Sequence, residues 1–169
     1  MKTIISVSFM LLLVVLSGCN VKPEKPSVHW TNIELKDINS GEIYKLSDYK
    51  GKKILFETFS VWCVNCKNQQ DKIKELNDDG VENLVIVSLS SDPNEDEEAI
   101  KKYINENGYT WHYSIAPKEL TEQLMQEFGF VILNAANTPI VLFCEDGSYS
   151  LLPDGLKGKE DLLNAVNSC

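Results

Sequence analysis

Apolar runs and amphipathic segments alternate along most of the chain. Runs that are rich in β-branched and aromatic residues and bounded by turn residues are typical of strands. This pattern predicts strands at 30–35, 42–46, 52–59, 84–89 and 109–115. Near the C-terminus, the turn Glu145-Asp146-Gly147 separates two further short runs, 140–144 and 148–152, and predicts a hairpin.

Four other segments have the apolar spacing of helices that bury one face. We expect these helices at 63–77, 94–107, 119–128 and 159–167. Gly108 and Gly129 follow two of them, where a glycine commonly ends a helix. The alternation predicts an α/β fold in which helices flank a central sheet, and the late hairpin makes that sheet mixed. The first two short strands form an N-terminal extension to it.

Composition limits the number of domains and the class of partner. The chain has 169 residues, of which 43% are hydrophobic, so it can bury the core of one ordinary domain, which we place at 28–169. The 25 Asp and Glu outnumber the 16 Lys and Arg, and the resulting net charge of -9 would repel a nucleic-acid backbone. We expect a monomer without a nucleic-acid partner.

The first residues have the pattern of an export signal. Lys2 precedes an apolar run of about 13 residues, which is too short to cross a bilayer as a helix but suits a signal peptide. The run ends in the sequence LSGC, which resembles the lipobox of bacterial lipoproteins. The resemblance implies a signal peptide over 1–18, a lipid on the thiol of Cys19, a tether over 19–27 and an extracytoplasmic membrane anchor. The alternative is an ordinary secretory signal in which Cys19 stands at the boundary by coincidence.

The main candidates for chemistry are Cys63 and Cys66 in the sequence WCVNC, between a predicted strand and a predicted helix. At a helix N-terminus, unpaired N–H groups and the helix dipole favour the thiolate, which is the form that attacks a disulfide. The second cysteine, one helical turn further on, can then resolve the mixed disulfide. This arrangement indicates thiol–disulfide exchange without a metal or other cofactor.

Other uses of the two cysteines fit the sequence less well. Zinc would need two more ligands, and no second CxxC is present. Covalent haem attachment would need a histidine where Lys67 stands. A purely structural disulfide remains an alternative, although so short a loop constrains the unfolded chain little.

From about Val28 to the C-terminus, the chain resembles the thioredoxin superfamily, in particular the membrane-anchored TlpA/ResA-like thiol–disulfide oxidoreductases. The matching pieces are GEIYKLSDYKGK at 41–52, the strand leading into WCVNC, the dipeptide Thr138-Pro139 and the hairpin near the C-terminus. The resemblance implies a thioredoxin fold and a cis peptide bond at Pro139. It also implies that the backbone of Thr138 pairs with an extended substrate, whose sulfur then lies near Cys63. A trans proline that merely begins a strand is the alternative.

The chain departs from the family at two positions near the cysteines. Asn65 replaces the proline that usually precedes the second cysteine, and Gln69 replaces a glutamate that is frequent in the membrane-anchored branch. Glu57 stands six residues before Cys63, where thioredoxins often hold a buried acid. Burial would raise its pKa and make it a base for the Cys66 thiol, whereas a strand-edge Glu57 would face water.

Three further side chains have two interpretations each. Trp62 either lies beside the sulfurs and shapes a docking surface for substrate, or belongs to the core. Cys144, late in a strand, and Cys169, at the end of the last helix, can form a structural disulfide. Alternatively, Cys144 is a small buried residue and Cys169 a free thiol.

Together these observations predict an extracytoplasmic oxidoreductase that exchanges disulfides with exported proteins in the reductive direction, although the same residues could also run the exchange as an oxidase. A membrane electron donor, such as a thiol–disulfide transporter, would restore the dithiol. Two alternatives belong to other classes: a Cu(I)-handling protein that uses Cys63 and Cys66 as soft ligands, and a redox-silent module that binds partners at Pro139.

Overall fold

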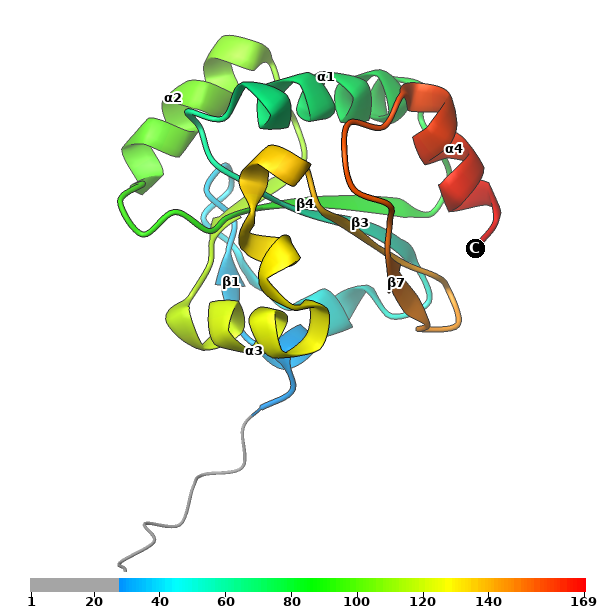
Figure 1. Ribbon diagram of the computed structural model, residues 1–169, viewed down its shortest axis with the longest axis horizontal. Coiled ribbons are helices and arrows are strands. Elements are labelled where there is room, and N and C mark those ends of the chain that lie inside the picture. Colours follow the sequence, from blue (N-terminus) through cyan, green and yellow to red (C-terminus); the bar gives the residue numbers. More distant parts are fainter. Residues whose placement is uncertain (1–27) are drawn as a thin grey trace, which may run out of the picture.

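The computed structural model describes residues 28–169, which form a mixed five-stranded sheet with strand order β5-β4-β3-β6-β7 (Figure 1). The strands are β3 (Lys53–Phe59), β4 (Leu84–Ser90), β5 (His112–Ile115), β6 (Ile140–Phe143) and β7 (Tyr149–Leu151). β3 is parallel to β4 and antiparallel to β6. The predicted mixed sheet is therefore confirmed, and β3 is its central strand.

Four helices cover the two faces of this sheet. They are α1 (Val64–Asp78), α2 (Glu97–Asn107), α3 (Lys118–Phe128) and α4 (Lys159–Asn167). α1, α2 and α4 lie on one side of the sheet and α3 on the other (Figure 1). The parallel strands β3, β4 and β5 are joined by crossover helices, as parallel neighbours require.

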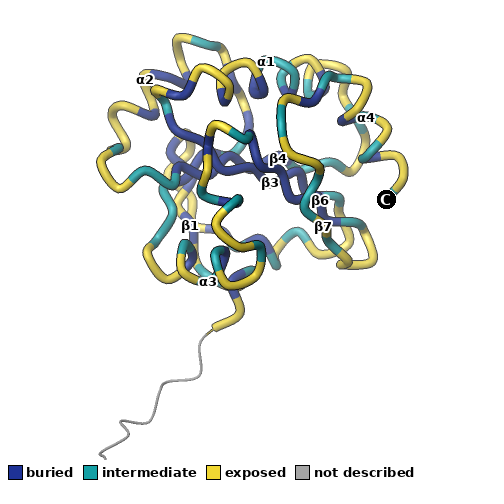
Figure 2. The backbone as a smooth tube through the Cα atoms, in the orientation of Figure 1, coloured by how far each residue is buried: buried dark blue, intermediate teal, exposed yellow. Residues whose placement is uncertain are grey.

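Side chains of β3 alternate between the two faces, and this alternation places an acid inside the protein. Leu55 and Phe59 belong to the hydrophobic cluster beneath α1, whereas Ile54 and Phe56 belong to the cluster on the α3 side. Glu57 lies between Leu55 and Phe59 along the strand and so shares their face. Figure 2 shows the central strands buried over their length, while the helices keep their outer sides exposed.

The N-terminal extension differs from the prediction. The expected strand at 30–35 is wrong: Trp30 begins a 3-10 helix, η1 (Trp30–Asn32), and only β1 (Leu35–Lys36) is extended. β1 pairs with β2 (Ile43–Tyr44), and the chain then enters the 3-10 helix η2 (Leu46–Tyr49). The reason is tertiary, because the Trp30 ring is buried among four aromatic rings, those of Phe56, Phe128, Phe143 and Tyr149.

The β4–α2 connection is longer than expected because α2 begins at Glu97 rather than near residue 94. The Asp96 carboxylate accepts a hydrogen bond from the Ala99 amide and caps the helix, which frees Glu95 for another role. The sequence analysis assigned no helix or strand to the segment between α3 and β6. It contains two 3-10 helices, η3 (Phe130–Leu133) and η4 (Ala135–Asn137).

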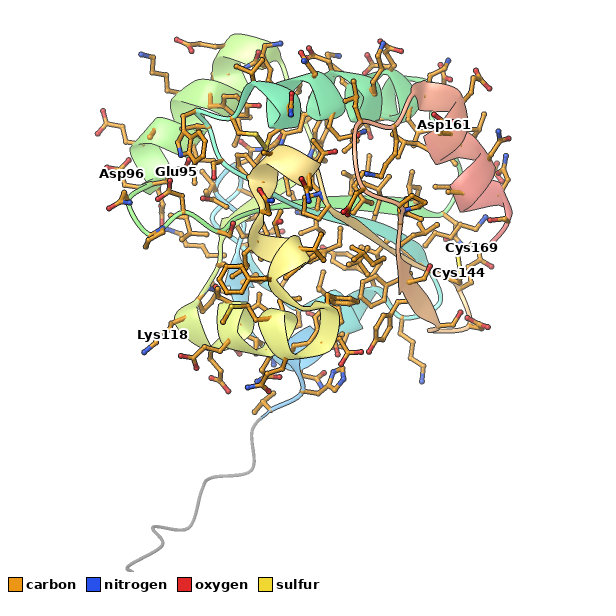
Figure 3. All side chains as sticks on the ribbon, in the orientation of Figure 1. Glu95, Asp96, Lys118, Cys144, Asp161 and Cys169 are labelled. Carbon is orange, nitrogen blue, oxygen red and sulfur yellow. A yellow bond between two sulfur atoms is a disulfide. The ribbon has the colours of Figure 1, made fainter. Side chains whose placement is uncertain are left out.

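Cys144 and Cys169 form a disulfide with a Cα–Cα distance of 5.0 Å (Figure 3). This bond joins the end of β6 to the residue that closes the chain after α4. The expected signal peptide, the lipidated Cys19 and the tether up to residue 27 lie outside the described residues. Within residues 28–169, none of the helices has the length and apolarity needed to cross a bilayer.

Candidate active site at the carboxyl end of the central strand

Cys63 and Cys66 lie where β3 leads into α1, and their sulfurs are paired as a disulfide. Their Cα atoms are 5.2 Å apart. Cys63 is the N-cap residue of α1, and its sulfur accepts a hydrogen bond of 3.1 Å from the Cys66 amide. A sulfur that accepts a backbone N–H at the positive end of a helix is stabilised as the thiolate in the reduced protein.

The two cysteines differ slightly in solvent exposure. Cys63 retains 6% exposure, while Cys66 retains 1%. Both residues are buried, and Cys63 is the more accessible of the two.

A short loop, η4 with its flanking residues, covers the second cysteine. The Cys66 sulfur lies 3.2 Å from the Ala135 carbonyl oxygen. The side-chain amide of Asn65 donates a hydrogen bond to the Ala136 carbonyl at 3.0 Å. Asn65, which replaces the family's proline, thus fastens the first turn of α1 to the loop across from it.

A cavity of about 280 Å³ opens beside the cysteines. Its lining residues are Ser60, Trp62, Ser91, Asp92, Pro93, Leu133, Asn134, Ala135 and Ala136. Trp62 is 68% exposed, so the interpretation of Trp62 as a core residue is wrong. The exposed indole beside Cys63 offers apolar contact area to a docking polypeptide.

Two acids of the β4–α2 connection hold the segment that precedes Cys63. The Asp92 carboxylate accepts from the Trp62 indole N–H at 2.7 Å. Glu95 accepts from the Val61 amide and from the Ser90 hydroxyl, each at 2.6 Å, and burial raises its pKa. Sequence reasoning assigned Glu95 to the first turn of α2 and missed this role. The signal in the sequence was Asp96: an aspartate at this position can cap a helix that begins at residue 97, which leaves Glu95 outside the helix.

The Thr138-Pro139 dipeptide does not have the conformation that the resemblance implied. Every peptide bond in residues 28–169 is trans, so the expected cis bond at Pro139 is absent. Thr138 instead has a left-handed backbone with φ 46° and is buried. Its N–H donates to the Ala135 carbonyl, and its own carbonyl accepts from Lys157. Because both groups are engaged within the chain, the expected pairing of Thr138 with a substrate does not fit this structure.

Glu57 is buried beneath α1, with 2% exposure. Its carboxylate accepts from the Ser88 hydroxyl on the neighbouring strand at 2.5 Å, and the Trp111 indole donates to the same hydroxyl at 2.8 Å. Burial raises the pKa of Glu57 to about 7, against the opposing effects of the Ser88 hydroxyl, the Gln70 amide and the Lys157 charge. A strand-edge Glu57 facing water is therefore ruled out.

Gln69 connects α1 to the loop between β7 and α4. Its side chain is fully buried, accepts from the Lys157 amide at 2.8 Å and donates to the Lys157 carbonyl at 3.2 Å. A glutamate could not make the second bond, because an ionised carboxylate has no donor. The departure from the family at Gln69 therefore has a structural reason.

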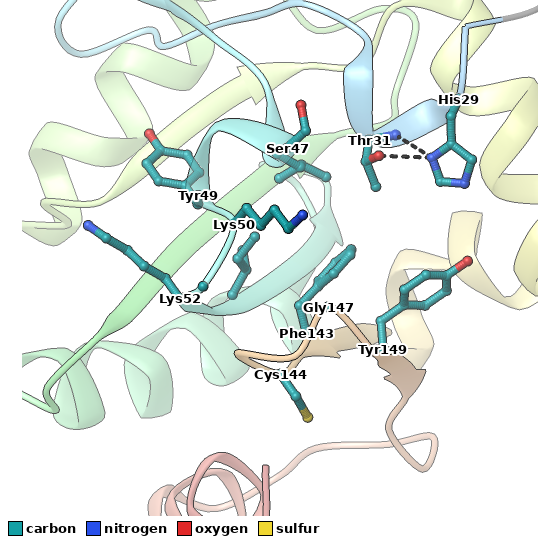
Figure 4. A pocket seen from close by; sticks show the side chains of 13 residues that line it. His29, Thr31, Ser47, Tyr49, Lys50, Lys52, Phe143, Cys144, Gly147 and Tyr149 are labelled. Carbon is teal, nitrogen blue, oxygen red and sulfur yellow. Dashed lines mark hydrogen bonds between the residues drawn. The ribbon is translucent and has the colours of Figure 1, made fainter.

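A second cavity, of about 220 Å³, lies at the opposite end of β3 (Figure 4). Ile54, Phe143 and Tyr149 contribute to its mostly apolar lining, together with Cys144. In the part of the chain that the structure describes, no group of three or more His, Cys, Asp or Glu side chains is arranged to hold a metal ion.

Comparison with known proteins assigns the chain to a family. The model of the AhpC/TSA family matches residues 27–143, and the chain belongs to that family. A search of the curated proteins finds no match. The family, the fold and the paired cysteines together define an oxidoreductase, as predicted.

Three solved structures with the same architecture are named as thiol–disulfide proteins. A thiol:disulfide interchange protein of the thioredoxin family from Chlorobium tepidum matches with a TM-score of 0.70 and 17% identity, over 80% of this chain and 91% of its own. The thioredoxin domain of a thiol-disulfide oxidoreductase from Bacteroides vulgatus matches with a TM-score of 0.62 and 25% identity, over 80% and 91%. A secreted Mycobacterium tuberculosis disulfide oxidoreductase matches with a TM-score of 0.63 and 12% identity, over 83% and 98%. The predicted α/β thioredoxin fold is confirmed.

Proposed function

We propose that this protein is an extracytoplasmic, membrane-anchored thiol–disulfide oxidoreductase that reduces disulfides of exported proteins. The observation that carries the proposal is the cysteine pair at the start of α1, close to a cavity lined by Trp62 and Ala135, with Cys63 the less buried residue and the Cys66 sulfur in contact with the Ala135 carbonyl. The export signal and Cys19 lipobox support the location, since they belong to proteins that leave the cytoplasm.

The proposed reaction begins with the reduced protein. The Cys63 thiolate attacks one sulfur of a substrate disulfide, forming a mixed disulfide and releasing the other substrate sulfur as a thiolate. Cys66 then loses its proton to the Glu57 carboxylate and attacks the Cys63 sulfur. The second substrate sulfur leaves as a thiolate and takes the proton that Glu57 received from Cys66, while the first substrate thiolate takes a proton from water. The substrate thus gains two electrons and two protons, and Cys63 and Cys66 become a disulfide.

The cycle needs a source of electrons to restore the dithiol. We propose a membrane thiol–disulfide transporter in this role, because exported proteins are separated from the cytoplasmic reductants. The lipid on Cys19 would keep the protein close to that donor. A diacylated or triacylated cysteine anchors far more firmly than a single acyl chain.

The reduction potential of the Cys63–Cys66 pair tests the direction. The full-length protein is equilibrated against a dithiothreitol or glutathione series, and its thiols are titrated. A reduction potential of about −270 mV, as in thioredoxin, supports a reductase, whereas a potential of about −120 mV would show an oxidase.

Trapping tests the substrate class. The Cys66→Ala variant should accumulate mixed disulfides through Cys63, because the resolving sulfur is missing, and Cys63→Ser should accumulate none. Cu(I) binding without turnover of a disulfide substrate would instead favour the copper-handling alternative. Full biological activity of Cys63→Ser would favour a redox-silent binding module.

A further inference from the structure

The cavity at the start of β3 combines an apolar interior with positive charge. It has a volume of about 220 Å³, and Ile54, Phe143 and Tyr149 contribute to its mostly apolar lining. Lys50 and Lys52 also line it, and none of the described residues that line it is acidic. Figure 4 shows the Lys50 side chain extending toward the middle of the lining residues, while Lys52 extends away from them. A ligand that suits this lining has an apolar part and a negative charge.

The lysines at this end of the molecule can attract a negatively charged partner. Lys50 and Lys52 are exposed, and the ion pairs formed within residues 28–169 include neither of them. The segment 45–53 holds four lysines and one aspartate, a formal charge of +3, although the whole chain has a net charge of -9. Three acids stand next to lining residues or are bonded to one, and each accepts a hydrogen bond within the chain: Asp48, Glu127 and Asp146.

The cavity lies where the described part of the chain begins. His29 and Thr31 form part of its wall. Cys19, the proposed site of the lipid, precedes His29 by ten residues, and ten residues span at most about 33–36 Å when fully extended. A bilayer that holds Cys19 is therefore within reach of the cavity. The reactive cysteines are at the other end of β3, since Ile54 lines the cavity and Cys63 follows Phe59.

We propose that this cavity binds an anionic phospholipid of the membrane that carries the anchor. The acyl chain lies against Ile54, Phe143 and Tyr149, and the phosphate contacts the Lys50 ammonium group. The proposal rests on the proposed membrane anchor. Each lysine close to an anionic bilayer strengthens binding by about fivefold, an attraction that a zwitterionic lipid does not provide. The bound lipid would hold the start of β3 against the bilayer and turn Cys63 away from it, toward exported proteins.

The experiment compares two vesicle compositions with the full-length protein. One set of vesicles contains phosphatidylcholine alone, and the other contains phosphatidylcholine with phosphatidylglycerol. The acetylation rate of each lysine is measured by mass spectrometry. Acetylation of Lys50 and Lys52 should slow about fivefold or more in the anionic vesicles. Lys101 is the control, because it is exposed on α2 and belongs to no ion pair within residues 28–169.

Two further rates decide whether the protection is local. The rates of Lys101 acetylation and of Cys63 alkylation in the reduced protein should be the same in both vesicles. Equal acetylation of Lys50 in the two compositions would overturn the proposal. Protection that increases with protein concentration, and not with phosphatidylglycerol, would also overturn it, since a second copy of the chain would then cover the cavity.

A substitution and a photoreactive lipid test the two parts of the site separately. In Lys50→Met, the protection of Lys52 should fall about fivefold, whereas Lys101→Met should leave it unchanged. Phosphatidylglycerol with a photoreactive group on its acyl chain should label Phe143 or Tyr149. Phe130 is the comparison, because it is 81% exposed and belongs to η3 rather than to the cavity. Labelling of Phe130 as strong as that of Phe143 and Tyr149 would contradict binding in the cavity.

The anchor and the lipid site can fail independently. The intact mass of the purified protein reports whether Cys19 carries a lipid. An unmodified Cys19 would refute the proposed anchor, while acetylation in the presence of the same vesicles would still decide whether the cavity binds an anionic lipid. None of these measurements uses a disulfide substrate, so they are also independent of the proposed exchange activity.

Discussion

At the scale of single residues, burial raises the pKa of an ordinary acid on the central strand. Glu57 occupies an inward position on the central strand, and its neighbours along that face are Leu55 and Phe59. Alternation along a strand can be predicted from sequence, but whether both faces are covered cannot. Here α1 covers the face that holds Glu57, and desolvation raises the pKa of its carboxyl to about 7.

The raised pKa of Glu57 makes the stability of the protein depend on pH. The folded state holds the Glu57 proton more tightly than the unfolded state, so stability should fall as pH rises from about 4.5 through about 7. Because a shift of one unit corresponds to about 1.4 kcal/mol, the total is on the order of 3 kcal/mol. Glu57→Gln should remove this dependence, measured by urea denaturation of the disulfide form at pH 5 and pH 8. The exposed Glu106→Gln is the control, and an equal pH dependence in Glu57→Gln and wild type would contradict the assignment.

At the scale of elements, the residues that begin and end helices predicted the helices better than the loops. Gly108 has a left-handed backbone and ends α2 as expected. The start of α2 was misplaced because two acids, Glu95 and Asp96, compete for the cap, and the contact of Glu95 with Val61 comes from a distant segment. η3 and η4 carry no periodic pattern, so the loop that covers Cys66 was not foreseen.

The disulfide between Cys144 and Cys169 should stabilise the protein without tuning its chemistry. It closes a loop with a sequence separation of 25, worth about 3 kcal/mol in the chain-entropy model. Residue 143 pairs with residue 54 at the start of β3, whereas Cys63 follows the end of that strand. The double variant Cys144→Ala/Cys169→Ala should therefore unfold at lower denaturant concentration while the Cys63–Cys66 potential stays unchanged. A shifted potential would show that the two ends of the sheet are coupled.

At the scale of the whole molecule, both faces of the sheet are covered by elements that lie within residues 28–169. One cluster packs beneath α1, α2 and α4, and the other combines α3 with the N-terminal extension. Trp30 belongs to the second cluster and is 3% exposed, so the extension is part of the core rather than an appendage. The first residues of the domain therefore contribute to its stability.

Residues 28–169 should fold on their own. We expect this fragment to match the full-length protein in denaturation midpoint and in the Cys63–Cys66 potential, because the two clusters are complete within it. A fragment that begins at Glu34 is the control. It lacks Trp30 and should lose about 3–5 kcal/mol, the usual cost of deleting a buried large aromatic side chain. Equal stability of the two fragments would contradict the importance of the extension.

The sequence by itself determined the order of strands and helices, the mixed sheet and the position of Cys63 and Cys66 at the start of a helix. These features follow from the spacing of apolar residues and from the residues that begin and end helices, and both signals extend over only a few positions. Only the tertiary structure decided that the backbone N–H and carbonyl of Thr138 are engaged within the chain, that Trp62 is exposed and that Glu57 is buried. Burial and electrostatic contacts between segments far apart in the chain depend on how the layers pack, and no local pattern encodes them.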